Sequence, residues 1–365
     1  MPSAITNYQC PACGGPLHFD AELQKLKCDY CGSVYTNEEI SAYYKEKNEE
    51  AIDVNTAEAQ ADAAQVLQWT EEEARHMRAY SCPSCGAQLI CDENTAATRC
   101  PYCDNPTIVP AQFDGALKPD YIIPFQLKKE QAVQKLREFY GGKPLLPSAF
   151  TRDNHIEEIK GIYVPFWLYD GTARAQMSYR GTRTHSHHAG DDLITVTEHY
   201  QLNREGSVRF NYVPADASSK MPDEFMDAIE PFKYDQMVPF EMSYLPGYLA
   251  DKYDVSKEED EQRADTRMKN TTIKAIRATV SGYSIVPERE QVHIRPDKVH
   301  YAFFPIWMLT TKWNDKIYMF AMNGQTGKMV GDLPIDNGKF IRYLLLITLG
   351  IMAVLFLLFF VILGY

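Results

Sequence analysis

YQCPACG at Tyr8–Gly14 and YSCPSCG at Tyr80–Gly86 are two copies of one motif. Each copy begins a set of two CxxC pairs separated by fourteen residues, and a shift of 72 residues carries the first set onto the second. Leu17 matches Leu89 in the same alignment. The sequence therefore contains an internal duplication of a four-cysteine unit. Its cysteines are Cys10, Cys13, Cys28, Cys31, Cys82, Cys85, Cys100 and Cys103.

This spacing is typical of a metal site. Two thiolates separated by two residues lie on one tight turn and bind a single tetrahedral ion together. The residue after each pair often needs a left-handed backbone, which Gly14, Gly32 and Gly86 supply and which Asp104 tolerates. Fourteen residues are enough for a β-hairpin that brings the second pair back to the first. We therefore predict two zinc ribbons with one Zn²⁺ each, although iron can also occupy four-thiolate sites.

Two other uses of cysteine compete with metal binding. Disulfides belong to secreted proteins, but MPSAITNYQC at the start of the sequence has neither the basic nor the apolar part of a signal peptide. Redox catalysis at a CxxC motif does not explain four pairs matched by spacing. The ninth cysteine, Cys91, aligns with Phe19 and is expected to be a buried apolar position.

Composition and charge limit the function classes. The chain has 365 residues, 45% of them hydrophobic and 24% charged, which excludes a mostly disordered protein and a polytopic transporter. Its formal net charge is −12, and the lysines and arginines of residues 1–118 do not cluster. Phosphate binding requires clustered basic side chains. We therefore expect the ribbons to act as rigid platforms for protein contacts rather than to bind nucleic acid.

The chain divides into five parts. Between the ribbons, a segment rich in Glu, Ala and Gln without Pro or Gly predicts an acidic helical linker that begins at an Asn37 N-cap. After Pro110, helical periodicity followed by alternating strands predicts an α+β domain. The expected parts are residues 1–36 for ribbon 1, 37–79 for the linker, 80–110 for ribbon 2, 111–336 for the α+β domain and 341–365 for an apolar helix.

The α+β domain is itself expected to be a repeat, spanning about 119–230 and 231–336. Each half has a Pro-aromatic strand, a helix and a second Pro-aromatic strand containing Trp. The segments are IIPFQL (Ile122–Leu127) and GIYVPFWLYD (Gly161–Asp170) in the first half, and MVPFEM (Met237–Met242) and YAFFPIWMLT (Tyr301–Thr310) in the second.

The C-terminal stretch Tyr343–Tyr365 carries no charge. As a helix it would be about 34 Å long, against about 30 Å for the hydrocarbon core of a bilayer. Lys339 and Arg342 precede it, and cytoplasmic flanks carry the excess of positive charge. We therefore expect a single-pass, tail-anchored protein of the bacterial cell membrane whose N-terminal domains are cytoplasmic.

Motifs for catalysis are lacking in the sequence. His185, His187 and His188 form a histidine cluster that could bind a metal, but polar neighbours indicate the tip of a hairpin. NGQTGK at Asn323–Lys328 lacks the spacing of a P-loop and predicts a hairpin turn before Met329. Because no Ser-His-Asp order, nucleophile elbow or dinucleotide loop is present, we do not expect an enzyme.

Taken together, the tandem ribbons, IIPF at Ile122–Phe125, GIYVPFW at Gly161–Trp167, NGQTGK and the apolar terminus resemble a bacterial family. These are TFIIB-type tandem zinc-ribbon proteins with a C-terminal membrane anchor, called YdjG-like. The resemblance implies association with phage-shock protein A-like and SPFH or flotillin-like proteins, and a role in recruiting them to the membrane. Asp104, in place of the usual Gly, is the one departure that we note.

We therefore expect a membrane-anchored cytoplasmic adaptor that scaffolds envelope-stress proteins at the inner membrane. The alternative is a membrane-tethered zinc-ribbon protein that binds nucleic acid, which the acidic charge disfavours. The sequence leaves open the partner-binding surface, the oligomeric state, and whether the α+β domain binds a small ligand.

Overall fold

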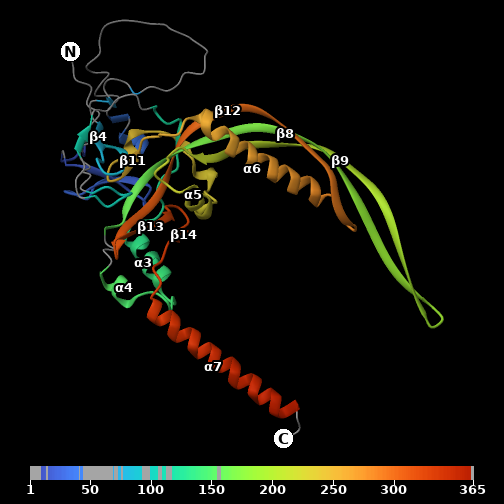
Figure 1. Cartoon of the computed structure of the whole chain (residues 1–365). Coiled ribbons are helices and arrows are strands. Elements are labelled where there is room, and N and C mark those ends of the chain that lie inside the picture. Colours follow the sequence, from blue (N-terminus) through green and yellow to red (C-terminus); the bar gives the residue numbers. More distant parts are fainter. Residues whose placement is uncertain are drawn as a thin grey trace.

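The structure of the chain is a computed structural model (Figure 1). It describes residues 10–13, 15–40, 42–43, 69, 73–74, 77–92, 99–105, 109–111, 117–153 and 158–362. Most of the predicted linker, residues 37–79, lies outside this part of the chain. The described residues form an α+β protein with small N-terminal strands, a large sheet, a long β-arm and one C-terminal helix.

Ribbon 1 has a sheet of its own. β1 (Leu17–Asp20), β2 (Lys25–Cys28) and β3 (Val34–Tyr35) follow one another in the sheet, and β1 and β2 form the expected hairpin between the cysteine pairs. The short helix that follows starts one residue earlier than predicted. Thr36, not Asn37, is its N-cap, because Thr36 Oγ1 accepts from Glu39 N (3.1 Å) while Thr36 N donates to the Glu39 carboxylate (2.7 Å).

Ribbon 2 shares the sheet of the α+β domain. β4 (Met77–Ser81) pairs with β5 (Gln88–Asp92) and with β6 (Val109–Ala111). β5 also pairs with β11 (Leu249–Asp251), which in turn pairs with the centre of the body. Among the described residues, the strands run in the order β10-β7-β12-β8-β11-β5-β4-β6. Ribbon 2 is therefore an edge of the main sheet.

The two Pro-aromatic segments with Trp form the centre of the body. They belong to β8 (Lys160–Ala189) and β12 (Ser284–Trp313), which pair antiparallel with Phe166 opposite Ala302. Both strands are buried on both faces here, which explains their continuous apolar sequence. The other elements of the body are β7 (Tyr121–Ile122), α3 (Lys129–Tyr140), α4 (Ser148–Asp153), α5 (Asp223–Ile229), η2 (Tyr234–Gln236), β10 (Val238–Pro239), η3 (Met242–Tyr244), β13 (Lys316–Asn323) and β14 (Met329–Gly331).

Beyond the body, β8, β12 and β9 (Asp192–Asp216) continue as a long curved arm (Figure 1). α6 (Lys257–Ala278) packs along one face of this arm. Its buried residues Ala264, Met268, Thr272 and Ile276 are spaced by four, as expected for one face of a helix. A capping box between Ser256 and Glu259 begins the helix. The sequence predicted a helix near this place, but not the length of the arm.

The pairing of the short strands has a two-fold pattern. β7 pairs parallel with β12, Tyr121 opposite Ala302, and β11 pairs parallel with β8, Leu249 opposite Ile162. The partner of β8 in this pattern is therefore β11, whereas the sequence comparison matched Ile122–Leu127 with Met237–Met242. The repeat at about 119–230 and 231–336 stays a prediction.

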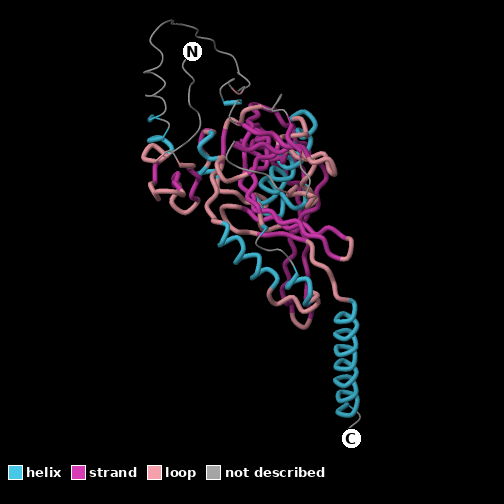
Figure 2. Tube along the Cα trace, turned by 90° about the vertical axis from the view of Figure 1, so that its left-hand side faces the viewer, coloured by secondary structure: helices cyan, strands magenta, loops and turns pink. Residues whose placement is uncertain are grey.

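The apolar terminus forms α7 (Asn337–Ile362), and residues 363–365 lie outside the described part. Within that part, α7 is the one helix long and apolar enough to cross a membrane. Its large apolar side chains are exposed, and Figure 2 shows the helix standing away from the rest of the chain. Lys339 Nζ donates to Leu146 O (2.7 Å), which ties the start of α7 to the body. These features fit a membrane anchor.

Candidate metal centres

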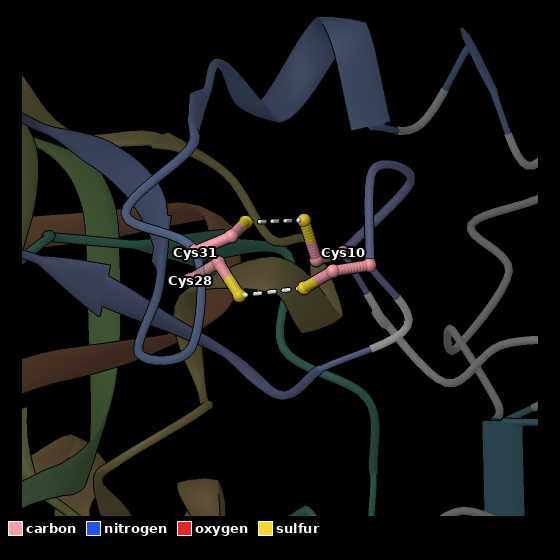
Figure 3. A group of neighbouring side chains, drawn as sticks. Cys10, Cys28 and Cys31 are labelled. Atoms are coloured by element: carbon pink, nitrogen blue, oxygen red, sulfur yellow. Dashed lines mark hydrogen bonds between the residues drawn. The ribbon is translucent and has the colours of Figure 1, made fainter.

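The four cysteines of ribbon 1 form a compact cluster whose sulfur atoms all lie within 4.8 Å of one another. The Sγ atoms of Cys10 and Cys31 are 3.5 Å apart, as are those of Cys13 and Cys28. Figure 3 shows sulfur atoms from the two turns facing one another. Thiolates around a tetrahedral zinc ion, at about 2.3 Å from it, lie about 3.8 Å apart. The cluster therefore has the donor set and nearly the dimensions of a four-thiolate metal site.

Ribbon 2 repeats this geometry. The Sγ atoms of Cys82 and Cys103 are 3.6 Å apart, and those of Cys85 and Cys100 are also 3.6 Å apart. All four sulfur atoms again lie within 4.8 Å of one another. The structure thus brings together the eight cysteines that the sequence proposed, in the two sets of four that the spacing predicted. The identity of the metal is not fixed by this geometry, and zinc stays a prediction.

The backbone of each turn explains the residue after the cysteine pair. The N–H groups of Gly32, Gly86 and Asp104 donate to the carbonyl oxygens of the cysteines four residues earlier, at 2.8–3.0 Å. These three residues have φ of 73°, 73° and 56°, in the left-handed region. Asp104 tolerates this conformation, and its carboxylate also binds Arg99 (3.2 Å). The fourth position, Gly14, lies outside the described residues.

The thiols of the two clusters differ in pKa, because hydrogen bonds and burial act on each of them differently. Hydrogen bonds with the side chain and the backbone of Ser33 lower the pKa of Cys31 to about 6. Burial raises the pKa of Cys82, but N–H groups of Cys85 and Ser84 outweigh burial and lower it to about 7. Burial raises the pKa of Cys85 to about 11. A divalent cation would replace the remaining protons, because thiolates are the metal ligands.

The two centres differ in what surrounds the tyrosine just before the last cysteine, which is Tyr30 in ribbon 1 and Tyr102 in ribbon 2. The sequence analysis missed the role of this tyrosine. In ribbon 2, Tyr102 is 4% exposed, and its hydroxyl donates to Asp251 Oδ2 on β11 (2.5 Å). Ser218 Oγ donates to the same oxygen (2.6 Å). In ribbon 1, the matching Tyr30 is 78% exposed. Both tyrosines could be seen in the sequence, but the partner of Tyr102 is 149 residues away.

The remaining candidates have simpler positions. Cys91 is fully buried in β5 and belongs to neither four-cysteine cluster, which confirms the prediction of a buried position. His185, His187 and His188 lie at the exposed end of β8, at the hairpin tip that the sequence predicted. In the described part of the chain, no group that could hold a metal includes them. NGQTGK connects β13 to β14, as predicted.

A cleft of about 400 Å³ lies between ribbon 1 and the body, although Phe19 and Leu26 of ribbon 1 pack in the core of the body. Its walls include Asp20 of ribbon 1, Lys128 before α3, and Trp307 of β12. The Lys128 ammonium lies 3.2 Å from Asp20 and 2.7 Å from the Glu22 carboxylate, so its charge is compensated within the chain. His18, Glu130 and Lys160 also line this cleft.

Comparison with known proteins gives one relative. No family model and no solved structure matches the chain. The chain is 33% identical over 336 residues to the uncharacterized protein YdjG of Bacillus subtilis (strain 168), and the match covers 92% of each chain. No match supports a TFIIB-type name or a link to phage-shock proteins. At this identity and coverage, the chain belongs to the YdjG family.

Proposed function

We propose that the protein is a membrane-anchored cytoplasmic adaptor, whose zinc-bound ribbon 1 recruits envelope-stress proteins to the inner membrane. Phage-shock protein A-like and SPFH or flotillin-like proteins are the partners that the family resemblance implies. α7 would hold the chain in the bilayer, and Lys339 and Arg342 before its apolar part favour a cytoplasmic body. Anchoring raises the effective concentration of the adaptor for partners at the membrane.

One observation carries this proposal, namely the exposure of the ribbon 1 turn. Tyr30 is 78% exposed beside a metal site that would hold it rigidly, whereas the same tyrosine of ribbon 2 is buried in the body. Leu23 and Val34 of ribbon 1 are also exposed, at 47% and 39%. Tyrosines on rigid surfaces are frequent anchors of protein interfaces. Ribbon 1 therefore has the features of a contact platform, and ribbon 2 those of a structural element.

Affinity capture of the full chain in detergent tests the proposal. We expect the wild-type protein to recover a phage-shock protein A-like or SPFH-like protein from stressed cells. Tyr30→Ala should reduce the amount of captured partner roughly tenfold or more. Ile317→Ala, which removes an exposed apolar side chain of β13, is the matched control and should capture normally. Both variants should keep two metal ions per chain. Equal capture by Tyr30→Ala, or recovery of nucleic acid alone, would contradict the proposal.

We infer further that the α+β domain arose by duplication. The parallel pairs β7–β12 and β11–β8 support this inference, because β7 and β11 each precede a helix and a Trp-containing strand. Each half then gives its short strand to the long strand of the other half. Neither half expressed alone should fold, because each lacks that pairing.

A further inference from the structure

The outer edge of β9 is a long row of backbone groups without a neighbouring strand. Among the described residues, β9 pairs with β8 alone, from Asp192 to Asp216. Such an edge is a template for pairing with another chain, and proteins usually protect it with proline, bulges or charge. The question is therefore whether β9 is protected or built to pair.

The two edges of the arm differ in this respect. β12, at the opposite edge, carries Pro287 and Pro296, and its pairing with β8 shifts register at both places. β9 has no proline before Pro214, which is already buried in the body. From Gly171 to Ala189, β8 pairs with β9 without a shift. The chain thus interrupts one edge of the arm with proline, and leaves the other regular, with charged side chains of both signs such as Glu198 and Arg204.

We propose that β9 pairs with β9 of a second copy of this chain, antiparallel, around a two-fold axis at Gln201. The axis stands perpendicular to the sheet, so that residues opposite one another share a face. Glu198 then lies opposite the second copy's Arg204, and the symmetric contact repeats the pair. The overlap extends from Asp192 to Phe210. Opposite charges across strands favour this register over its neighbours.

The same register covers apolar side chains that the single chain leaves exposed. α6 covers the inner face of β9 near Gly206, where an added Cβ would lie 2.9 Å from Ile276. Beyond the helix, Ile194 and Val196 are 42% and 37% exposed on that face. In the pair, Val196 faces the second copy's Gly206 and Ile194 faces its Val208. The segment of β9 that α6 leaves exposed therefore lies beside the segment that α6 covers in the other copy. The two α6 helices then do not overlap.

The pairing leaves α7 on one side of the joined sheet in both copies. In Figure 1, α6 and α7 lie on the same side of the arm, and a two-fold axis perpendicular to the sheet leaves that side unchanged. The pairing itself rests on β9 and not on the adaptor role, so either proposal can fail without the other.

Cross-linking tests the position of the axis. Gln201→Cys in the full chain, solubilised in detergent, should form a disulfide-linked dimer under mild oxidation, because residues at the axis lie within the 4.4–6.8 Å Cα separation that a disulfide requires. Gln176→Cys is the matched control, since Gln176 is exposed on the neighbouring strand β8, away from the axis. It should stay monomeric on a non-reducing gel. Equal cross-linking of both variants, or of neither, would overturn the proposed register.

A charge exchange tests the contact without relying on a new cysteine. Glu198→Arg places like charges opposite one another twice, and should raise the dimer dissociation constant about tenfold. Adding Arg204→Glu to the same chain restores the opposite charges and should return the dissociation constant to near its original value. The mass of the detergent complex, measured by light scattering, reports the outcome. A wild-type protein that is monomeric, or a double variant no better than Glu198→Arg, would overturn the proposal.

Discussion

Ribbon 1 and ribbon 2 have the same ligands at the same spacing, yet they are attached to the molecule in different ways. Ribbon 1 has a separate three-stranded sheet, whereas β5 of ribbon 2 pairs with β11 of the body. Tyr30 is exposed in the first and Tyr102 is bonded to a buried carboxylate in the second. A duplicated metal unit that packs on the body can therefore present its tyrosine to solvent in one copy and bury it in the other.

Loss of a metal site should have the largest effect, and this effect should differ between the two ribbons. Cys100→Ser breaks the site that holds Tyr102 and β5 against the body, so we expect it to destabilise the whole α+β domain by about 5 kcal/mol or more. Cys28→Ser should lose one metal ion and unfold ribbon 1, and it should destabilise the domain less, because ribbon 1 has a sheet of its own although Phe19 and Leu26 pack in the core of the body. Metal analysis and calorimetry of the full chain measure both effects. Equal destabilisation by the two variants would contradict the comparison.

Asp251 of β11, the buried carboxylate that Tyr102 of ribbon 2 contacts, should give the body a pH dependence that ribbon 1 lacks. Burial raises the pKa of Asp251 from 3.8 to about 7. The folded state then holds a proton that the unfolded state loses, so this contribution is complete below about pH 4 and is lost as the pH rises through about 7. The full change is on the order of 4 kcal/mol at most.

Asp251→Asn removes that titration, and its amide oxygen can still accept from Tyr102 and Ser218. Denaturant unfolding between about pH 5.5 and 8 should show a smaller loss of stability with rising pH than in the wild type. Metal content measured at each pH is the control. An unchanged slope would mean that Asp251 does not titrate in this range.

Tyr102→Phe tests the hydroxyl alone. It leaves Ser218 as the remaining donor to Asp251 Oδ2 and should lower the free energy of unfolding by about 1–2 kcal/mol. The matched variant, Tyr30→Phe, changes the same atom in an exposed ring and should alter stability by less than about 0.5 kcal/mol. Chemical denaturation of the two variants side by side gives the difference. Similar losses would show that Tyr30 is not the free counterpart of Tyr102.

The sequence predicts the structural features that depend on residues close to one another in the chain. Spacing alone places the four sulfur atoms of each site, because two residues between cysteines define one turn, and the uncharged run after Arg342 is sufficient for α7. The attachment of ribbon 2 depends on Asp251, far along the chain, and no pattern near Tyr102 indicates it. The length of the arm was missed because β8 and β9 run for 30 and 25 residues, far beyond the usual length of a strand, and no local pattern indicates where such strands end.

The smallest effect concerns the reason why the two tyrosines differ. Gly15 of ribbon 1 aligns with Ala87 of ribbon 2. A Cβ at Gly15 would lie 2.7 Å from Cδ2 of Tyr30 and 3.2 Å from the sulfur of Cys28, so the ring lies against a space that only glycine leaves open. Gly15→Ala should therefore displace the Tyr30 ring, at a cost of about 1 kcal/mol or less because the exposed ring can move.

The displaced ring should reduce partner capture while ribbon 1 keeps its metal ion. Shifted Tyr30 ring resonances, measured by NMR, together with metal content would report this combination. Ala87→Gly is the reciprocal variant and should leave Tyr102 in place, since its hydroxyl remains bonded to Asp251. If Gly15→Ala leaves the ring resonances unchanged, glycine at this position is not what sets the outward orientation of Tyr30, and the exposure of the ribbon 1 turn must come from its separate sheet alone.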